Sequence, residues 1–167
     1  MDQQSPLAER PLQSILPALP IVDFAYRRRD KEEKAALRAE FHWGGRQSFL
    51  KALVHRQGDD LRRAGFTEQS LACLARGRAP RGFQVHHIRP LDDGGTNDYA
   101  NLVLIRAHPE HEAIHRYLDP QIQNLVVGET RMVRLPQPAA GICPSPSPEA
   151  QPKPLAMALA ARHLRQR

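Results

Sequence analysis

Five of the eight histidines in this 167-residue chain lie between His86 and His115, and their spacing restricts what the segment can form. His111 and His115 are four residues apart in a segment that predicts a helix, so both imidazoles project from one face. His86 and His87 are neighbours in a predicted strand, where successive side chains point to opposite faces. A metal ion can therefore be held by the helical pair and one member of the strand pair, which leaves the other for a different task.

The residues around these histidines predict the order strand, loop, strand, helix. Residues 82–87 indicate a short strand, and residues 101–105 indicate a second strand that is apolar and β-branched. Between them, the run at 90–96 contains the proline, aspartates and glycines that are typical of a loop. Pro109 is well placed at the first position of a helix that carries the two spaced histidines and ends near residue 120.

The segment that precedes this motif predicts helices. Strong helix formers fill 30–41, and apolar residues at helical spacing mark 47–57. Thr67 is typical of an N-cap for a third helix over 68–76. We expect these helices to be ended by glycines, namely Gly44-Gly45, Gly58 and Gly77.

The predicted fold class is α+β, with a mainly helical N-terminal part followed by the strand-strand-helix motif and a short β-hairpin. The motif spans 82–119, and the hairpin is expected over 125–135 around Gly128-Glu129. We expect a disordered Pro-rich lead over 1–22 and one domain over 23–144. Residues 145–167 are expected to form a Pro-rich linker and a basic tail.

The chain is basic, with 24 lysines and arginines against 18 acidic residues and a formal net charge of +6. Nearly all of these cations are arginines, whose planar donors suit phosphate oxygens, so a polyanion is a reasonable partner. Cys73 and Cys143 are far apart, which excludes a paired-cysteine zinc site. No apolar run approaches a membrane span, and the N-terminus lacks the pattern of a Sec signal peptide. We expect no membrane partner and a cytoplasmic location as made.

This division of the histidines suits hydrolysis of a phosphodiester bond. Three neutral imidazoles around one divalent ion leave coordination positions open for a phosphate oxygen and for the 3′-oxygen that leaves. A separate histidine can act as general base on the attacking water, since its pKa is near neutral pH. Such a base needs a group that holds its ring. Asn101 stands at the start of the facing strand and is placed to do this.

At these residues the chain resembles the HNH, or ββα-metal, endonucleases. The likeness rests on Val85-His86-His87, the loop over 90–96, Asn101-Leu102 and the His111/His115 helix. It is closest to the four-histidine version in colicin/pyocin-type DNases and related bacterial polymorphic toxins. The resemblance implies that His86, His111 and His115 are metal ligands. It also implies that His87 is the general base and that Asn101 orients it and braces the loop.

The resemblance further implies hydrolysis of DNA with one divalent ion, which could be Mg²⁺, Mn²⁺, Zn²⁺ or Ni²⁺. Arg89, Arg106 and Arg116 flank the site and are candidate phosphate-binding residues. A bacterial toxin would be delivered to the cytoplasm of a target cell by a route other than a Sec signal. It would also have a small acidic immunity protein as a partner.

Two other interpretations stay open. The chain could be a phage or mobile-element HNH nuclease, although such enzymes commonly carry recognition modules or paired cysteines. It could also be a non-catalytic, metal-stabilised module that only binds DNA. One position departs from the colicin pattern, because Gln84 stands where those enzymes carry an acid two residues before the histidine pair.

Overall fold

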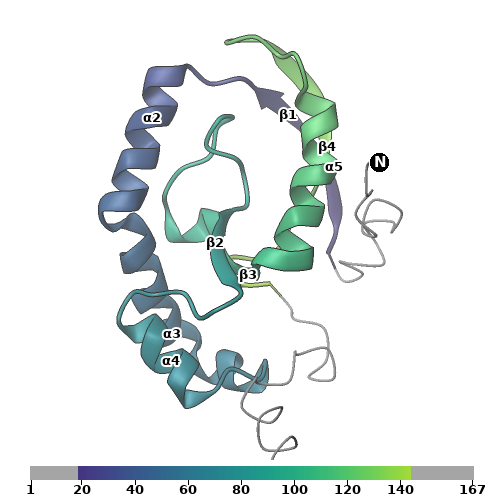
Figure 1. Ribbon diagram of the computed structural model, residues 1–167. Helices are drawn as coiled ribbons and strands as arrows, with labels where there is room; N and C mark the ends of the chain where they lie inside the picture. The colour runs from purple at the N-terminus through teal and green to yellow at the C-terminus, as the bar shows by residue number, and fades with distance from the viewer. Residues whose placement is uncertain (1–18, 144–167) are drawn as a thin grey trace, which may run out of the picture.

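The computed structural model describes residues 19–143 and has the expected α+β class (Figure 1). The predicted tail over 145–167 and residues 1–18 of the predicted lead lie outside the described residues. None of the helices within 19–143 has the length and apolar character that crossing a bilayer requires. In chain order, the elements are β1 (Ile21–Arg27), α2 (Lys31–Glu40), η1 (Phe41–Gly45), α3 (Arg46–Arg63), α4 (Glu68–Ala75), β2 (Phe83–His87), η2 (Tyr99–Asn101), β3 (Leu102–Arg106), η3 (Ala107–His111), α5 (Glu112–Ile122), β4 (Thr130–Pro136) and β5 (Gly141–Ile142).

The centre of the fold is β3, which pairs antiparallel with β2 and parallel with β5. Four consecutive residues of β3 are buried, and they alternate between two apolar clusters. Leu102 and Leu104 pack with residues of α3 and α4, whereas Val103 and Ile105 pack with residues of α5 and β4. The small sheet is therefore covered on both faces, which explains a strand with four consecutive apolar residues.

The helical N-terminal part is confirmed, but two of its predicted stops are wrong. The chain runs from α2 through the wide turn η1 directly into α3, so Gly44-Gly45 does not end a helix. At Gly58 the helix also continues, with a local kink at Gln57 (φ −132°, ψ 27°). A glycine costs only about 1 kcal/mol inside a helix, and burial of Phe49 and Leu61 on the inner face offsets that cost.

The predicted caps are confirmed. The hydroxyl of Thr67 accepts a hydrogen bond from the Ser70 amide at 3.2 Å, which starts α4. Gly77 follows α4 with a positive φ of 74°, the conformation that ends many helices and that glycine adopts without strain. Together these residues set the length of the helix that packs beneath β3.

The predicted hairpin over 125–135 is wrong in its partner. Its second half is the strand β4, but β4 pairs antiparallel with β1 near the N-terminus. Val126 and Val127 are 66% and 52% exposed and lie in the turn that precedes β4. β1 begins at Ile21, inside the predicted lead, so the domain expected from residue 23 opens with a strand and not within its helical part. Burial of Tyr26 and Val133 between this ribbon and α5 favours the long-range pairing.

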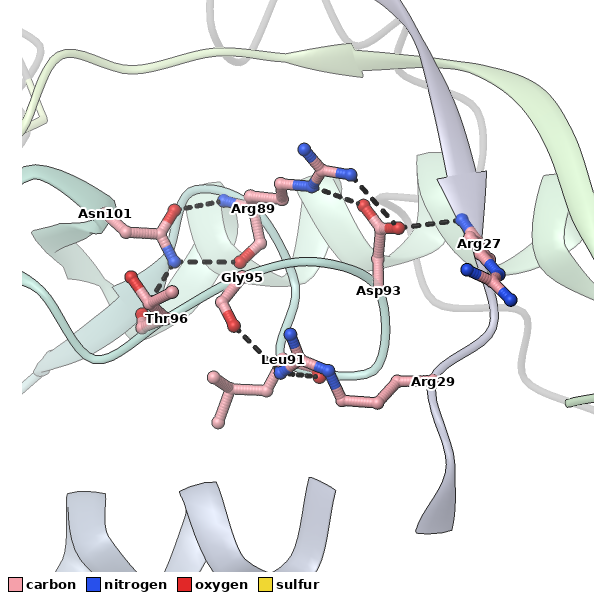
Figure 2. Close-up of polar contacts among 8 residues, drawn as sticks. All are labelled: Arg27, Arg29, Arg89, Leu91, Asp93, Gly95, Thr96 and Asn101. Carbon is pink, nitrogen blue, oxygen red and sulfur yellow. Dashed lines mark hydrogen bonds and ion pairs between the residues drawn. The ribbon is translucent and has the colours of Figure 1, made fainter. Parts of the chain in front are cut away.

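The loop between the two motif strands, residues 88–101, is braced from within by one side chain (Figure 2). The Asn101 carboxamide oxygen accepts from the Arg89 amide at 2.8 Å. Its amide group donates to the carbonyls of Arg89 and Thr96, at 3.0 and 2.8 Å. We call residues 88–101 the motif loop. Asn101 closes it into a compact ring that ends where β3 begins.

The strand that precedes α2 ties the same loop to the rest of the molecule (Figure 2). The buried Asp93 carboxylate accepts from the backbone amide of Arg27 at 2.7 Å. The Arg29 guanidinium donates to the carbonyls of Leu91 and Gly95, at 3.0 and 2.9 Å. The motif loop is thus held by both backbone and side-chain donors from the end of β1 and the residues that follow it.

Gly95 is the tightest point of the motif loop, which yields a stability prediction. A Cβ there would lie 2.0 Å from the Arg89 carbonyl oxygen and 2.7 Å from that of Pro90. We expect Gly95→Ala to lower the free energy of unfolding by at least about 2 kcal/mol, because backbone must move. Gly44→Ala is the matched control, since nothing lies within 4 Å of its added methyl. It should be neutral or stabilise by up to about 1 kcal/mol. Urea unfolding measures both, and equal effects would contradict the packing account.

Candidate metal centre and active site

Three histidines converge at one point between β2 and α5. His86, on β2, is paired with Val103 and so faces α5, while His111 and His115 are one turn apart on the helical run that includes α5. Each offers a ring nitrogen, and these three atoms all lie within 4.8 Å of one another. The structure therefore brings together the three residues that the sequence predicted as ligands.

The donor set fits a divalent ion of the transition series. The Nε2 atoms of His111 and His115 are 3.2 Å apart. Two nitrogens that each bind one ion at about 2.1 Å, with bond angles of 90–110°, would be separated by about 3.0–3.4 Å. The Asp119 carboxylate lies 3.8 Å from Nδ1 of His115, on the side away from the cluster. A carboxylate there can orient a ligating imidazole.

The surroundings of His86 and His111 favour the neutral imidazole, which is the form that binds metal. Burial lowers the pKa of His86 well below its usual range, and the neighbouring histidines lower it further. Burial, with a smaller contribution from His115, lowers the pKa of His111 to about 4. The lone pairs of both rings are therefore available across the neutral pH range.

His87 points to the opposite face of β2 and is separate from the cluster. Its ring packs on Phe41, with the ring centroids 4.6 Å apart, and its Nε2 lies 3.0 Å from the carboxamide oxygen of Asn97. The Asn97 amide group donates to the Leu37 carbonyl at 2.9 Å, so its oxygen is the acceptor and His87 carries the proton on Nε2. Burial lowers the pKa of His87, and the positive charge of Arg38 acts in the same direction, while the Asn97 contact opposes both.

The two asparagines of the motif have different positions. The side chain of Asn101 bonds to the backbone of the motif loop. Its backbone carbonyl accepts a hydrogen bond at 2.8 Å from the amide of Ile88, the residue directly after the histidine pair. The side chain that contacts the His87 ring is that of Asn97. Sequence reasoning did not single out Asn97, because a lone asparagine beside Asp98 in a Gly-rich loop is typical of a turn residue.

The three arginines proposed for phosphate binding each contact a carboxylate. Arg89 donates to the buried Asp93 at 2.7 Å, and Arg116 pairs with Glu112 on α5. Arg106 pairs with the buried Glu110 at 2.8 Å, and its side chain is only 15% exposed. These side chains do not line the cleft that contains His86 and His87, within the part of the chain that the structure describes.

That cleft has a volume of about 350 Å³ and is lined by residues of α2, η1, β2, the motif loop and α5. Figure 1 shows α2 and α5 on either side of β2. The cationic or titratable side chains that α2 and η1 contribute are Lys34, Arg38 and His42. Sequence reasoning missed all three as site residues. Their spacing of four residues was the available signal, because it places them on one helical face.

The remaining histidines occupy other positions. Nδ1 of His108 lies 2.6 Å from the Glu112 carboxylate on the exposed side of the helix start. His55 is exposed on α3 and does not line the cleft. His163 lies outside the described residues.

Comparison with known proteins identifies an HNH segment. Residues 72–108 match the family model described as HNH endonuclease, a span that begins within α4 and contains the histidine pair, the motif loop and β3. The chain is also 33% identical over 132 residues to a protein of Escherichia coli (strain K12) named "Uncharacterized protein YhhZ". The match covers 79% of this chain but only 33% of that relative, so the chain spans about a third of its length. No solved structure matches. The family match indicates a nuclease and, with the histidine cluster, a divalent metal.

The Arg106–Glu110 pair gives a prediction that separates a structural role from phosphate binding. Arg106→Met leaves the buried Glu110 carboxylate, which is 3% exposed, without its cation. We expect the free energy of unfolding to fall by about 3–5 kcal/mol. The double variant Arg106→Met/Glu110→Met should recover most of that loss, because it removes both charges. Denaturant unfolding measures both variants. Wild-type stability of the single variant would contradict the structural role.

Proposed function

We propose that this chain is an HNH-type endonuclease that hydrolyses DNA phosphodiester bonds with one divalent ion. The observation that carries the proposal is that the two adjacent histidines of β2 point to opposite faces of the strand and have different surroundings. His86 joins His111 and His115 in a cluster of converging nitrogens, whereas the adjacent His87 faces the other way and is held by Asn97. A purely structural metal site has no need of a separately positioned histidine beside its ligands.

His86, His111 and His115 would hold the ion. When bound, it would supply Lewis-acid stabilisation of the charge that develops on phosphate oxygens and on the leaving 3′-oxygen. The candidates are Mg²⁺, Mn²⁺, Zn²⁺ and Ni²⁺; three imidazoles favour tight binding of the borderline metals, and the metal that supports turnover need not bind most tightly.

His87 is proposed as the general base. Because its Nε2 carries the proton that Asn97 accepts, Nδ1 has the free lone pair that can take a proton from water. A lowered pKa keeps that lone pair available at neutral pH. Attack of this water on phosphorus would release products with 5′-phosphate and 3′-hydroxyl ends. Asn101 would contribute by holding the motif loop that joins the two strands.

His87→Ala tests this role against a non-catalytic, DNA-binding module. We expect the variant to bind Zn²⁺ or Ni²⁺ as the wild type does but to nick supercoiled plasmid about 10²–10⁴-fold more slowly. His111→Ala should lose metal binding as well as nicking, and chelator should abolish nicking by the wild type. His55→Ala is the matched control, because His55 is an exposed histidine of α3 outside the cleft.

Two results of this experiment would contradict the proposal. One is a wild-type protein that binds the ion and leaves plasmid intact over a range of added metals. The other is a His87→Ala protein whose nicking rate equals that of His55→Ala.

We further propose that the biological setting is that of a bacterial toxin or effector nuclease. The support is the resemblance of the histidine motif to the four-histidine version in colicin/pyocin-type DNases and related polymorphic toxins. A phage or mobile-element nuclease is the alternative. A toxin would be cytoplasmic when made and would act in the cytoplasm of a target cell. A small acidic immunity protein would complement the formal charge of +6.

Controlled expression in a bacterial host tests the toxin proposal. We expect the wild-type chain to reduce viability by orders of magnitude, and His87→Ala to be tolerated at the same expression level, because only cleavage of host DNA kills. Co-expression of the product of an adjacent gene, where that product is small and acidic, should restore growth. A nuclease that is active in vitro but harmless in the cytoplasm would favour the phage or mobile-element alternative.

A further inference from the structure

One wall of the cleft is a cationic face of α2 and the turn that follows it. Lys34, Arg38 and His42 line the cleft at intervals of four residues, so successive side chains rise by about 6 Å along the helix. The opposite wall includes His111 and His115. A polyanionic chain in this cleft would therefore have the metal cluster on one side and a row of cationic or titratable groups on the other.

The residues of this face differ in how far protein carboxylates already neutralise them. Lys34 lies 3.4 Å from the Asp92 carboxylate, which also pairs with Arg28 at 2.6 Å. Arg38 is exposed and has no carboxylate within ion-pair distance among residues 19–143. Its guanidinium is thus available for an external anion.

The backbone that carries Arg38 is fixed relative to His87. The preceding residue, Leu37, accepts a hydrogen bond from Asn97 through its carbonyl, and the same carboxamide contacts the His87 ring. Asn97 therefore links α2 to the histidine that faces away from the metal cluster. Because Arg38 follows the residue that Asn97 contacts, its backbone is positioned before a ligand binds, which reduces the entropy lost on binding.

We propose that Arg38 binds a backbone phosphate of DNA across the cleft from the histidine cluster, with Lys34 as a weaker second contact. DNA as the ligand class rests on the proposed function. A guanidinium presents two parallel donors to a phosphate, and this geometry would hold the strand over His87. Arg89, Arg106 and Arg116, by contrast, each already donate to a protein carboxylate.

Binding of a fluorescent DNA duplex in the presence of chelator tests this contact without cleavage. At moderate salt, Arg38→Ala should weaken binding roughly tenfold, the effect of losing one hydrogen-bonded ionic contact. The slope of log K against log salt should become shallower by about 0.9, the contribution of one phosphate contact. Arg63→Ala is the matched control. It removes the same charge from an exposed residue of α3 that does not line the cleft, so it should change neither quantity appreciably.

Arg38→Lys distinguishes the effect of the positive charge from the effect of the two parallel guanidinium donors. It should keep the wild-type salt slope and bind with intermediate affinity, because lysine retains the charge and loses the paired donors. Arg38 is exposed, so both variants should unfold at the wild-type urea concentration, which checks that the fold is intact.

The proposal is overturned if Arg38→Ala matches Arg63→Ala in affinity and slope, or if Arg38→Lys loses the slope as fully as Arg38→Ala. Failure of the proposed function gives a different result. In that case metal-loaded wild-type protein would leave plasmid intact, while Arg38→Ala would still bind the duplex more weakly and with a shallower salt slope than the wild type.

Discussion

The pairing of β2 with β3 is the constraint on which the site depends. Because β3 is buried on both faces, its side chains fix which face of the sheet packs on α5 and which packs on α3 and α4. The register sets His86 opposite Val103 and His87 opposite Leu102, so the two imidazoles are sent to different faces. A slip of one residue would exchange their places and would also move Val85 out of its apolar surroundings. Core packing and site assembly are therefore enforced by the same contacts.

The motif nevertheless depends on the rest of the chain for its environment. Arg27, the last residue of β1, donates its amide to the motif loop, and Arg29 donates both its amide and its guanidinium. Arg28 adds an ion pair to Asp92 and a hydrogen bond to the Ile122 carbonyl at the end of α5. The arginine triplet thus joins both walls of the cleft to the loop. An isolated strand-strand-helix segment would lack these bonds, and it would also lack the contact of Asn97 with α2.

The local patterns of the sequence predicted the centre of the site. Alternation in a strand and the four-residue spacing of a helix are backbone properties, so short segments alone predicted that His111, His115 and one member of the His86-His87 pair can share an ion. The choice of His86 within that pair came from the resemblance to the HNH endonucleases. The caps at Thr67 and Gly77 were predictable for the same reason. The helix stops at the glycines were not, because burial of side chains on α3 outweighs the small local cost of Gly44 and Gly58. Likewise, the β1–β4 pairing joins segments more than a hundred residues apart, and no turn signal announces it.

Electrostatic roles were the least predictable from the sequence, because charge alone does not distinguish a paired cation from an available one. The chain has 24 basic and 18 acidic side chains, so most arginines can find a carboxylate in the folded protein. Proximity in sequence to the histidines drew attention to Arg89, Arg106 and Arg116, yet proximity also brings the acids at i+4 or i−4 that pair with them. Arg38 lies far from the motif in sequence and reaches the cleft only through the packing of α2. In a basic protein, an arginine is therefore available to an external phosphate when no carboxylate of the folded chain pairs with it. Which arginines lack such a partner depends on the tertiary structure.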